Sequence, residues 1–408
     1  MIKVDENPGA VTVNFMFMVC FMAALSSFGS FVNDMFVPSM PEMTRTFGCS
    51  VSTMELGLTM GMIGLALGQF VLGPVSDKYG RKPVLVISLL VFVAAGLISI
   101  FSPTVEFFLV CRLFQGVGAS GCYFLARTVP TDIYGGRALA KTMAIIGAIN
   151  GIAPASAPVF GGLLSQSLGW RSVFVFLTLF AVVLVLCSRR LKETLPPGRR
   201  LPGPVWHTFG RYVTLSRNKP FIVHTMLKGT ALGFLFAYIS SATYIIQDHF
   251  GFNQLQFGLI MGGNAIFVVF GSLVALRFRL LKDAGVVGAA ILFVSVSAEA
   301  VVLMCADSRF WLYEALLVPS MFALGMIFTM SNTLAMNEGK ADAGTASAFL
   351  GIVGYIFGAI VPPLVGMGDV LHPTAVTFEA LAVLVAVFAL LSRRIAPDLV
   401  ASQQTQGA

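Results

Sequence analysis

The sequence predicts an all-α membrane protein whose twelve transmembrane helices form two six-helix bundles. Three observations carry this prediction: the composition, the spacing of the apolar stretches and the positions of the basic residues. Of the 408 residues, 57% are hydrophobic and only 11% are charged, whereas soluble domains carry about 25% charged residues. So few charges cannot cover a surface that faces water, and most of this surface must therefore face lipid.

Twelve apolar stretches, bounded by charged residues, Gly or Pro, are long enough to cross a bilayer, which takes about 20 helical residues. The first stretch is too long for the apolar part of a signal peptide, which reaches about 15 residues, and we expect it to be the first spanning helix. The predicted spans are 11–36, 50–74, 83–101, 104–129, 139–164, 170–188, 220–247, 254–277, 285–305, 310–335, 344–366 and 372–392.

The positions of the basic residues predict the orientation. If the N-terminus is cytoplasmic, 21 of the 26 Lys and Arg fall in cytoplasmic segments, and only Arg45, Arg171 and Arg309 fall in outside loops. Cytoplasmic loops of membrane proteins carry this excess of Lys and Arg. We therefore expect both termini in the cytoplasm. The net charge of +7 then faces the lipid bilayer surface, and no nucleic-acid partner is needed to explain it.

A polar segment rich in Pro and Arg, 189–219, divides the apolar stretches six and six. It predicts an N-terminal bundle over 1–188, a cytoplasmic linker over 189–219 and a C-terminal bundle over 220–408. Two six-helix halves joined in this way indicate a duplicated transporter. Within the linker, "TFGRYVTL" at 208–215 is expected to form a short interfacial helix.

Neither catalysis nor metal binding is expected. The six Cys are scattered without the spacing of metal ligands, and the four His are isolated from one another. There is no nucleophile–base pair and no sizeable soluble domain to support a membrane-bound enzyme or a receptor. We expect no catalytic residues, no metal and no cofactor.

The loop between the second and third spans carries a motif. Gly73, Asp77, Gly80, Arg81 and Lys82 have the spacing G-x-x-x-D-x-x-G-R-[RK]. This segment resembles the loop signature of the major facilitator superfamily. The resemblance implies that the Asp77 carboxylate faces the positive N-terminus of the eleventh helix and latches the cytoplasmic side shut when the protein faces outward. The alternative is a basic loop that only sets topology.

The fourth span contains a charge, Arg112, in the segment "CRLFQGVGASG". A charge inside a membrane helix is costly and is a functional hypothesis by default. The segment resembles the R-x-x-Q-G-x-G-A pattern of the same superfamily, which implies a part in proton transfer. The alternative is that Arg112 snorkels to the outer interface.

The fifth span resembles the antiporter signature G-x-x-x-G-P-x-x-G-G through Pro154, Pro158, Gly161 and Gly162. Ala153 and Ala157 replace glycines expected before Pro158. The resemblance favours an exporter over a symporter. The alternative is a bent helix that packs closely and has no further role.

The end of the first span carries Asp34, followed by Pro38 and Pro41 in the D-x-x-x-P-x-x-P spacing of twelve-helix drug:proton antiporters. Desolvation beside a cavity favours the protonated form of an acid. With Arg112 modulating it, Asp34 is the expected proton-coupling residue. The alternative is an interfacial acid that caps the next segment.

Polar side chains of the helices that line the pathway in this superfamily are the candidate cavity residues. Lys228 either snorkels to the cytoplasmic interface, the favoured interpretation, or selects an anionic or zwitterionic substrate. Glu299 either pairs with a neighbouring helix or acts in transport, and Glu55, Glu314 and Glu379 are expected at the interfaces. The cavity candidates are Asn33, Gln115, Tyr123, Lys228, Tyr238, Tyr244 and Asn332, with Asn150 and Asn264 as further possibilities.

Together these motifs resemble the Bcr/CflA (bicyclomycin resistance) subfamily of the drug:proton antiporter-1 group. The loop after the eighth span, "RFRLLKDAG", lacks the G-R-K ending, which puts a second, symmetric latch in doubt. The resemblance implies a monomeric antiporter of the bacterial inner membrane that exports drugs or other small molecules and uses protons as the coupling ion. The alternative is export of one endogenous metabolite, such as a metallophore or an amino-acid derivative.

Overall fold

The computed structural model describes residues 15–200, 209–304, 309–340 and 343–395. These residues contain helices and no strand. Twelve of the helices are long and apolar enough to cross a membrane, which confirms the predicted fold class. The outermost predicted residues of two spans, 11–14 and 305, lie outside the described residues.

The first half of the chain contributes α1 (Phe15–Asp34), η1 (Val37–Ser39), α2 (Met40–Phe47), α3 (Val51–Tyr79), α4 (Arg81–Ile100), α5 (Val105–Ile133), α6 (Gly136–Leu168) and α7 (Arg171–Ser188). The second half contributes α9 (Lys219–Tyr244), η4 (Ile245–His249), α10 (Gln254–Ala275), α11 (Leu281–Met304), α12 (Phe310–Glu338), α13 (Ala343–Val365) and α14 (Leu371–Ile395). Between them lie η2 (Pro197–Arg199) and α8 (Phe209–Ser216). The division of the chain at 188 and 220 into two domains and a linker stays a prediction.

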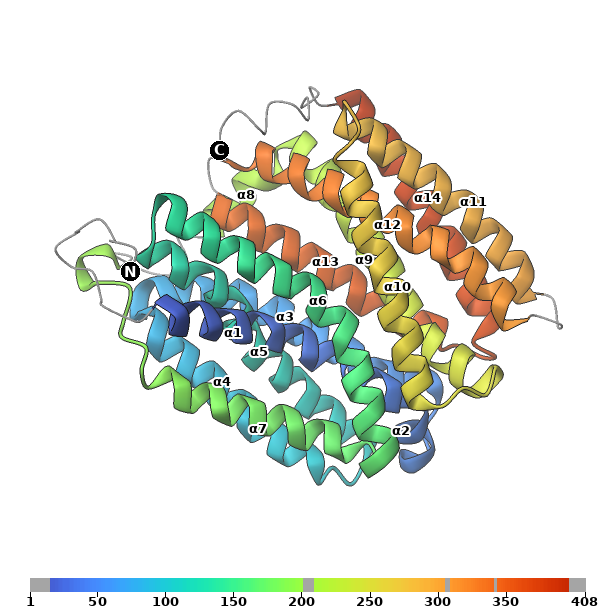
Figure 1. The fold of residues 1–408 in the computed structure, drawn as a ribbon, viewed down its shortest axis with the longest axis horizontal. Coiled ribbons are helices and arrows are strands. Elements are labelled where there is room, and N and C mark those ends of the chain that lie inside the picture. Colours follow the sequence, from blue (N-terminus) through green and yellow to red (C-terminus); the bar gives the residue numbers. More distant parts are fainter. Residues whose placement is uncertain (1–14, 201–208, 305–308, 341–342, 396–408) are drawn as a thin grey trace.

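The two ends of the helix bundle differ in composition. We call the end where α3 joins α4, α5 joins α6 and α10 joins α11 the basic end, because Lys78, Arg81, Lys82, Arg277 and Arg279 lie there. We call the opposite end, which holds α2 and η4, the closed end. In Figure 1, α8 lies at the basic end and α2 at the closed end.

Two helix pairs join the halves: α3 packs against α13, and α6 packs against α10. Glycines make the second contact close. A Cβ on Gly258 of α10 would lie 2.4 Å from the Pro158 carbonyl oxygen of α6, and one on Gly162 would lie 2.3 Å from the Gln254 carbonyl oxygen. Backbones can approach this closely only where side chains are absent.

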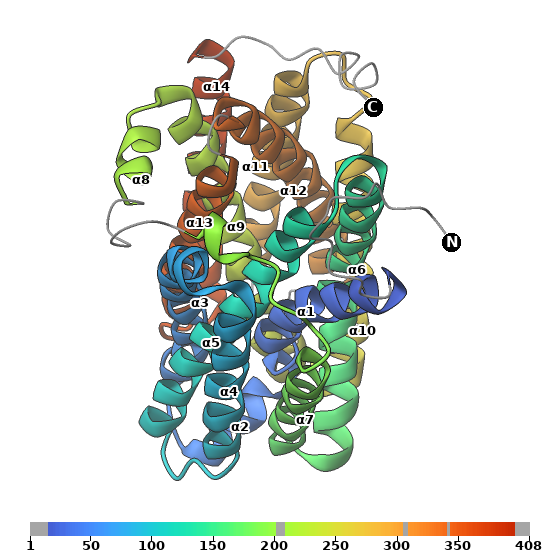
Figure 2. The same ribbon diagram turned by 90° about the vertical axis from the view of Figure 1, so that its left-hand side faces the viewer.

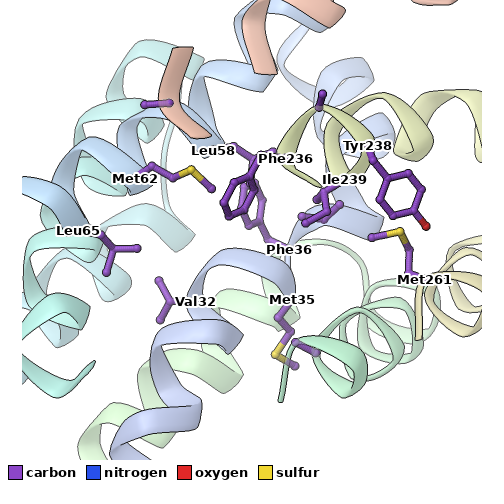
Figure 3. Close-up of a cluster of buried hydrophobic side chains, with 14 of the residues drawn as sticks. Val32, Met35, Phe36, Leu58, Met62, Leu65, Phe236, Tyr238, Ile239 and Met261 are labelled. Atoms are coloured by element: carbon purple, nitrogen blue, oxygen red, sulfur yellow. The ribbon is translucent and has the colours of Figure 1, made fainter. Parts of the chain in front are cut away.

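Apolar side chains fill the space between the halves. Figure 3 shows Val32 and Met35 of α1 and its following turn converging with Met62 of α3, Phe236 of α9 and Met261 of α10. All except Phe236 and Met261 are less than 1% exposed, and those two are 7% exposed. Unbranched Met side chains fill irregular space between helices.

The short helix α8 matches the predicted helix in the linker. Its Tyr212 ring lies 5.4 Å from the Phe70 ring of α3 and 6.2 Å from the Phe349 ring of α13. Burial and the nearby Asp77 carboxylate raise the pKa of Tyr212 above its ordinary value. The helix therefore contacts both halves at the basic end (Figure 2).

Candidate functional site

A cavity of about 380 Å³ lies between the two halves. Six of the residues expected to matter line it: Asn33, Asp34, Tyr123, Pro154, Pro158 and Tyr238. Apart from Tyr355, the other lining residues are apolar or small, and include Leu232, Phe236, Ile239, Met261 and Met321. The cavity is therefore a mostly apolar space with one carboxyl group among its lining residues, that of Asp34.

Asp34 and Arg112 lie close together but have different surroundings. Asp34 is 8% exposed at the cavity wall, and Arg112 is fully buried behind it. The Arg112 guanidinium donates to the Gly57 carbonyl oxygen at 3.2 Å and to Gln115 Oε1 at 2.9 Å. The charges of Asp34 and Arg112 interact. The snorkelling alternative for Arg112 is wrong, because its side chain turns into the protein.

The glycines of the fourth-span motif explain this arrangement. A Cβ on Gly116 of α5 would lie 2.2 Å from the Gly61 carbonyl oxygen of α3, and one on Gly64 would lie 2.2 Å from the Leu113 carbonyl oxygen. The two helices therefore touch backbone to backbone, which brings Arg112 against the carbonyl of Gly57. Gln115 continues the chain of hydrogen bonds to Ser99 at 2.9 Å. Gln115 thus supports Arg112, and the cavity lining does not include it.

The antiporter-like segment of α6 lies between both halves. Pro154 and Pro158 line the cavity, and Gly161 packs so closely that a Cβ there would lie 1.8 Å from the Met35 carbonyl oxygen. The chain after α1 and the start of α10 therefore both rest on this part of α6.

Polar contacts between the halves seal the closed end. Tyr244 belongs to this seal, since its hydroxyl lies 2.9 Å from Thr44 Oγ1, and the cavity lining does not include it, contrary to the prediction. The other contacts join Arg45 to Asp248 at 3.2 Å, Gln247 to the Pro38 carbonyl oxygen at 3.0 Å, Gln254 to Glu42 at 3.0 Å and Ser52 to the Pro363 carbonyl oxygen at 3.0 Å.

Glu55 also belongs to the closed end, and its expected interfacial position is wrong. The side chain is fully buried, and Ser240 of α9 donates to one of its carboxyl oxygens. The other oxygen has no hydrogen-bond partner among the described residues.

The loop motif forms a network with α5 and with the start of the predicted linker. Arg81 donates to Asp77 at 2.5 Å and to Asp132 of α5 at 2.9 Å, while the Glu193 carboxylate accepts from the Arg81 backbone at 2.9 Å. Lys82 also donates its backbone N–H to Glu193, at 3.2 Å. Gly80 adopts a φ of 107°, which favours glycine. Asp132 and Glu193 were missed in the sequence; both are lone acids in strongly basic segments.

Asp77 is half-exposed, and its carboxylate pairs with Arg81. The latch that the resemblance implies belongs to an outward-facing state. Gly73 lies against the Phe124 ring, 3.8 Å from where a Cβ would stand, and leaves space for that side chain.

The second half has its own polar groups. Lys228 donates to Asn332 of α12 at 2.8 Å, and the cavity lining includes neither of them, contrary to the prediction. Asn264 donates to the Tyr238 hydroxyl at 2.9 Å. Glu299 is fully buried, and neither of its oxygens has a partner among the described residues, so the expected pairing with a neighbouring helix is not seen there.

The remaining candidates are placed differently. Glu314 is partly buried near the closed end of α12, and Glu379 of α14 accepts from Ser297 of α11 at 3.0 Å. The side chain of Asn150 lies outside the described residues. In the described part of the chain, no group of three or more His, Cys, Asp or Glu could hold a metal ion.

Comparison with known proteins decides the family. The family model described as Major Facilitator Superfamily matches residues 19–362. The chain belongs to the major facilitator superfamily. An uncharacterised transporter of this type from Bacillus subtilis is 32% identical over 91% of this chain and 93% of its own length. This chain is accordingly a membrane transporter and not an enzyme.

Two further similarities fit this assignment. A chloramphenicol resistance protein of Pseudomonas aeruginosa is 31% identical over 58% of this chain and 56% of its own length. A bacterial homologue of the human lysosomal transporter Spinster, solved in an inward-facing, unoccupied conformation, has a TM-score of 0.75 at 15% identity, covering 94% of this chain and 98% of that one. The likeness to this major facilitator structure shows the fold alone.

Proposed function

We propose that this transporter is a proton-coupled antiporter that exports drugs or other small molecules by alternating access. The observation that carries the proposal is the position of Asp34 at the cavity wall, with the buried Arg112 behind it. An acid in this position is able to hold a proton in one conformation and release it in another, because its solvation changes when the halves rock. Resistance to chloramphenicol, named for one relative, supports a drug as substrate.

The contacts between the halves support an assignment of the conformation. Polar contacts between the halves, among them Thr44–Tyr244 and Ser240–Glu55, close one end, whereas the ion pairs of the loop motif at the basic end stay within the first half. With the basic end in the cytoplasm, as the excess of Lys and Arg there indicates, the described conformation is inward-facing. An outward-facing state would then bring Asp77 toward the start of α13.

The finer assignments belong to the same proposal. We place the chain in the Bcr/CflA subfamily, as a monomer in the inner membrane of a bacterium with both termini in the cytoplasm. The N-terminal bundle 1–188 and the C-terminal bundle 220–408 are the rocking bodies, and 189–219 is the cytoplasmic linker. One proton that moves down about 100 mV supplies about 2.3 kcal/mol, enough for a roughly fiftyfold substrate gradient.

Proteoliposomes test the coupling. We expect radiolabelled chloramphenicol to move against its gradient when a pH gradient is imposed, and Asp34→Asn to reduce this movement to background while the protein stays folded. Asp369→Asn is the matched control, because this exposed acid pairs with His372 in a loop and leaves the cavity unchanged. Substrate movement that ignores the pH gradient would exclude antiport.

A second candidate, export of one endogenous metabolite, is favoured by the Lys228–Asn332 contact, since a cation beside the pathway selects among substrates. A deletion strain separates the two functions. Broad hypersensitivity to unrelated drugs supports the drug exporter, and accumulation of one metabolite with unchanged drug susceptibility supports the alternative.

A further inference from the structure

Three polar side chains from three helices extend the cavity lining toward the basic end. On α9, Lys228 stands four residues before Leu232, and Leu232 lines the cavity, so both lie on one helix face. On α5, Arg127 stands four residues after Tyr123, another lining residue. On α12, Asn332 lies eleven residues, about three helical turns, after the lining residue Met321. We call Arg127, Lys228 and Asn332 the mouth residues.

Contacts hold the two cations of the mouth in place. The Arg127 guanidinium donates to the Tyr123 hydroxyl at 2.7 Å and lies 4.5 Å from the centre of that ring. Lys228 is bonded to Asn332, and its charge interacts with that of Arg127. The two cations belong to opposite halves of the chain, one on α5 and one on α9, and they lie close enough for their charges to interact.

Neither cation has an acidic partner. No carboxylate of the described residues forms an ion pair with Arg127 or Lys228, whereas Arg81 and Arg45 both have one. The carboxyl group of the cavity, Asp34, lies further toward the closed end, and Tyr355 stands within reach of the charges of both Asp34 and Arg127. Lys228 is half-buried and Arg127 is exposed. Their like charges repel each other, and an anion between them would relieve this repulsion.

The rest of the cavity offers apolar surface for a substrate body. Leu232, Phe236 and Ile239 continue the Lys228 face of α9 into the cavity, and Met261 and Met321 lie opposite. A solute with an apolar body in this space would place a charged end at the mouth residues.

We propose that the transporter takes amphiphilic organic anions, with the apolar body in the cavity and a carboxylate or other oxyanion between Arg127 and Lys228. The anion neutralises both cations and bridges the two halves. Their repulsion favours an open basic end when the site is empty, and the bound anion removes the repulsion and draws the halves together. This inference rests on the proposed export function and specifies its substrate class.

Equilibrium binding tests the substrate class with two probes that differ in charge alone. Pyrenebutyrate is an anion at neutral pH, and pyrenebutanol is its neutral counterpart. Binding is followed by quenching of tryptophan fluorescence in phosphatidylcholine nanodiscs, with empty nanodiscs as the blank, so that no anionic lipid competes for the cations. We expect pyrenebutyrate to bind about tenfold more tightly, the equivalent of one retained charge-assisted hydrogen bond.

The double variant Arg127→Gln/Lys228→Gln should reduce this preference to less than about twofold, because both charges that recognise the anion are gone. Arg277→Gln is the matched control, since it removes an exposed cation from the same end but away from the mouth. Thermal unfolding of each variant verifies the fold, and the single variants Arg127→Gln and Lys228→Gln report the same preference if the double variant does not fold.

Equal affinity for the two probes in the native protein would overturn the proposal, as would a preference that survives in the double variant. Adding phosphatidylglycerol to the nanodiscs distinguishes a transported anion from an anionic lipid headgroup as the ligand of the mouth residues. If pyrenebutyrate no longer binds in these nanodiscs, the mouth residues bind a lipid headgroup, and the proposed substrate class is wrong. Suppose that chloramphenicol transport follows the pH gradient but the protein binds the two pyrene probes equally well. That result would overturn the proposed substrate class and would still support the export function.

Discussion

The closed end and the basic end of this transporter are held by different kinds of contact. At the closed end, mainly neutral hydrogen bonds, an exposed ion pair and close backbone contacts join the two halves, as between Thr44 and Tyr244 and between Gly258 and Pro158. At the basic end, the strong ion pairs of Arg81 stay within the first half, and the groups whose charges interact across the mouth, Arg127 and Lys228, are both cations.

This difference shows how one molecule can favour one conformation without being locked in it. Neutral hydrogen bonds contribute about 1 kcal/mol each, so a handful of them close an end but can exchange with water when the halves rock. A pair of like charges at the other end opposes closure until an anion arrives. Three predictions test the comparison, from the largest expected effect to the smallest.

A side chain at Gly258 should force the two halves apart at the closed end. In Gly258→Leu the new side chain overlaps the Pro158 carbonyl oxygen, and overpacking costs about 1–3 kcal/mol, which shifts the ratio of open to closed states roughly 5- to 150-fold. Spin labels on Thr46 and His249, one in each half, report the opening as an increased distance.

Gly263→Leu is the control for this wedge. It lies on the same helix, α10, and a Cβ there meets no heavy atom within 4 Å. An unchanged distance between the spin labels in Gly258→Leu would mean that the contact between α6 and α10 does not hold the closed end shut.

Glu55 should make the closed end sensitive to pH. An ionised carboxylate buried against a single hydroxyl is costly, so ionisation favours the state that exposes Glu55 to water. We expect opening of the closed end to increase with pH in the native protein, by roughly three- to tenfold, and Glu55→Gln to abolish this dependence. The same spin labels measure it.

Tyr244 is the other titratable group whose charge interacts with Glu55, so Tyr244→Phe is examined beside it. Glu379→Gln is the matched control, because this acid accepts from Ser297 within the second half. If the closed end of the Glu55→Gln variant opens with increasing pH to the same extent as that of the native protein, the Glu55 carboxyl group does not control its closure.

The Arg45–Asp248 ion pair should contribute least. Its side chains are 70% and 46% exposed, and exposed pairs are worth about 0.2–1 kcal/mol at most. A double-mutant cycle with Arg45→Gln and Asp248→Asn should therefore change the open fraction less than about fivefold, and less still at high salt. A larger coupling energy would show that charge, rather than neutral contact, closes this end.

Much of the fold was predictable from sequence, because each segment that crosses the lipid as a helix needs about 20 predominantly apolar residues. The twelve spans follow from apolar length, and their described ends differ from the predicted ones by a few residues. The proposed roles of Asp34 and Arg112 followed from motifs together with the cost of a charge inside a membrane. Arg127 falls within the predicted span 104–129, and no motif marked it as a candidate residue.

Contacts between distant segments could not be predicted in this way. Glu55 was placed by its distance from a helix end and Tyr244 by the helix that carries it, and neither says which neighbour covers the side chain. The cation pair at the mouth joins positions 127 and 228, which no local pattern connects.

The sequence by itself determined that most of the surface faces lipid, how many helices span the membrane and which family the chain belongs to. Hydropathy, charge and short motifs are local properties. Only the tertiary structure decided which end is closed, which polar groups line the cavity and which cations lie close to each other. Those properties depend on how two halves of one chain pack, and burial and charge interactions act between neighbours in space rather than in sequence.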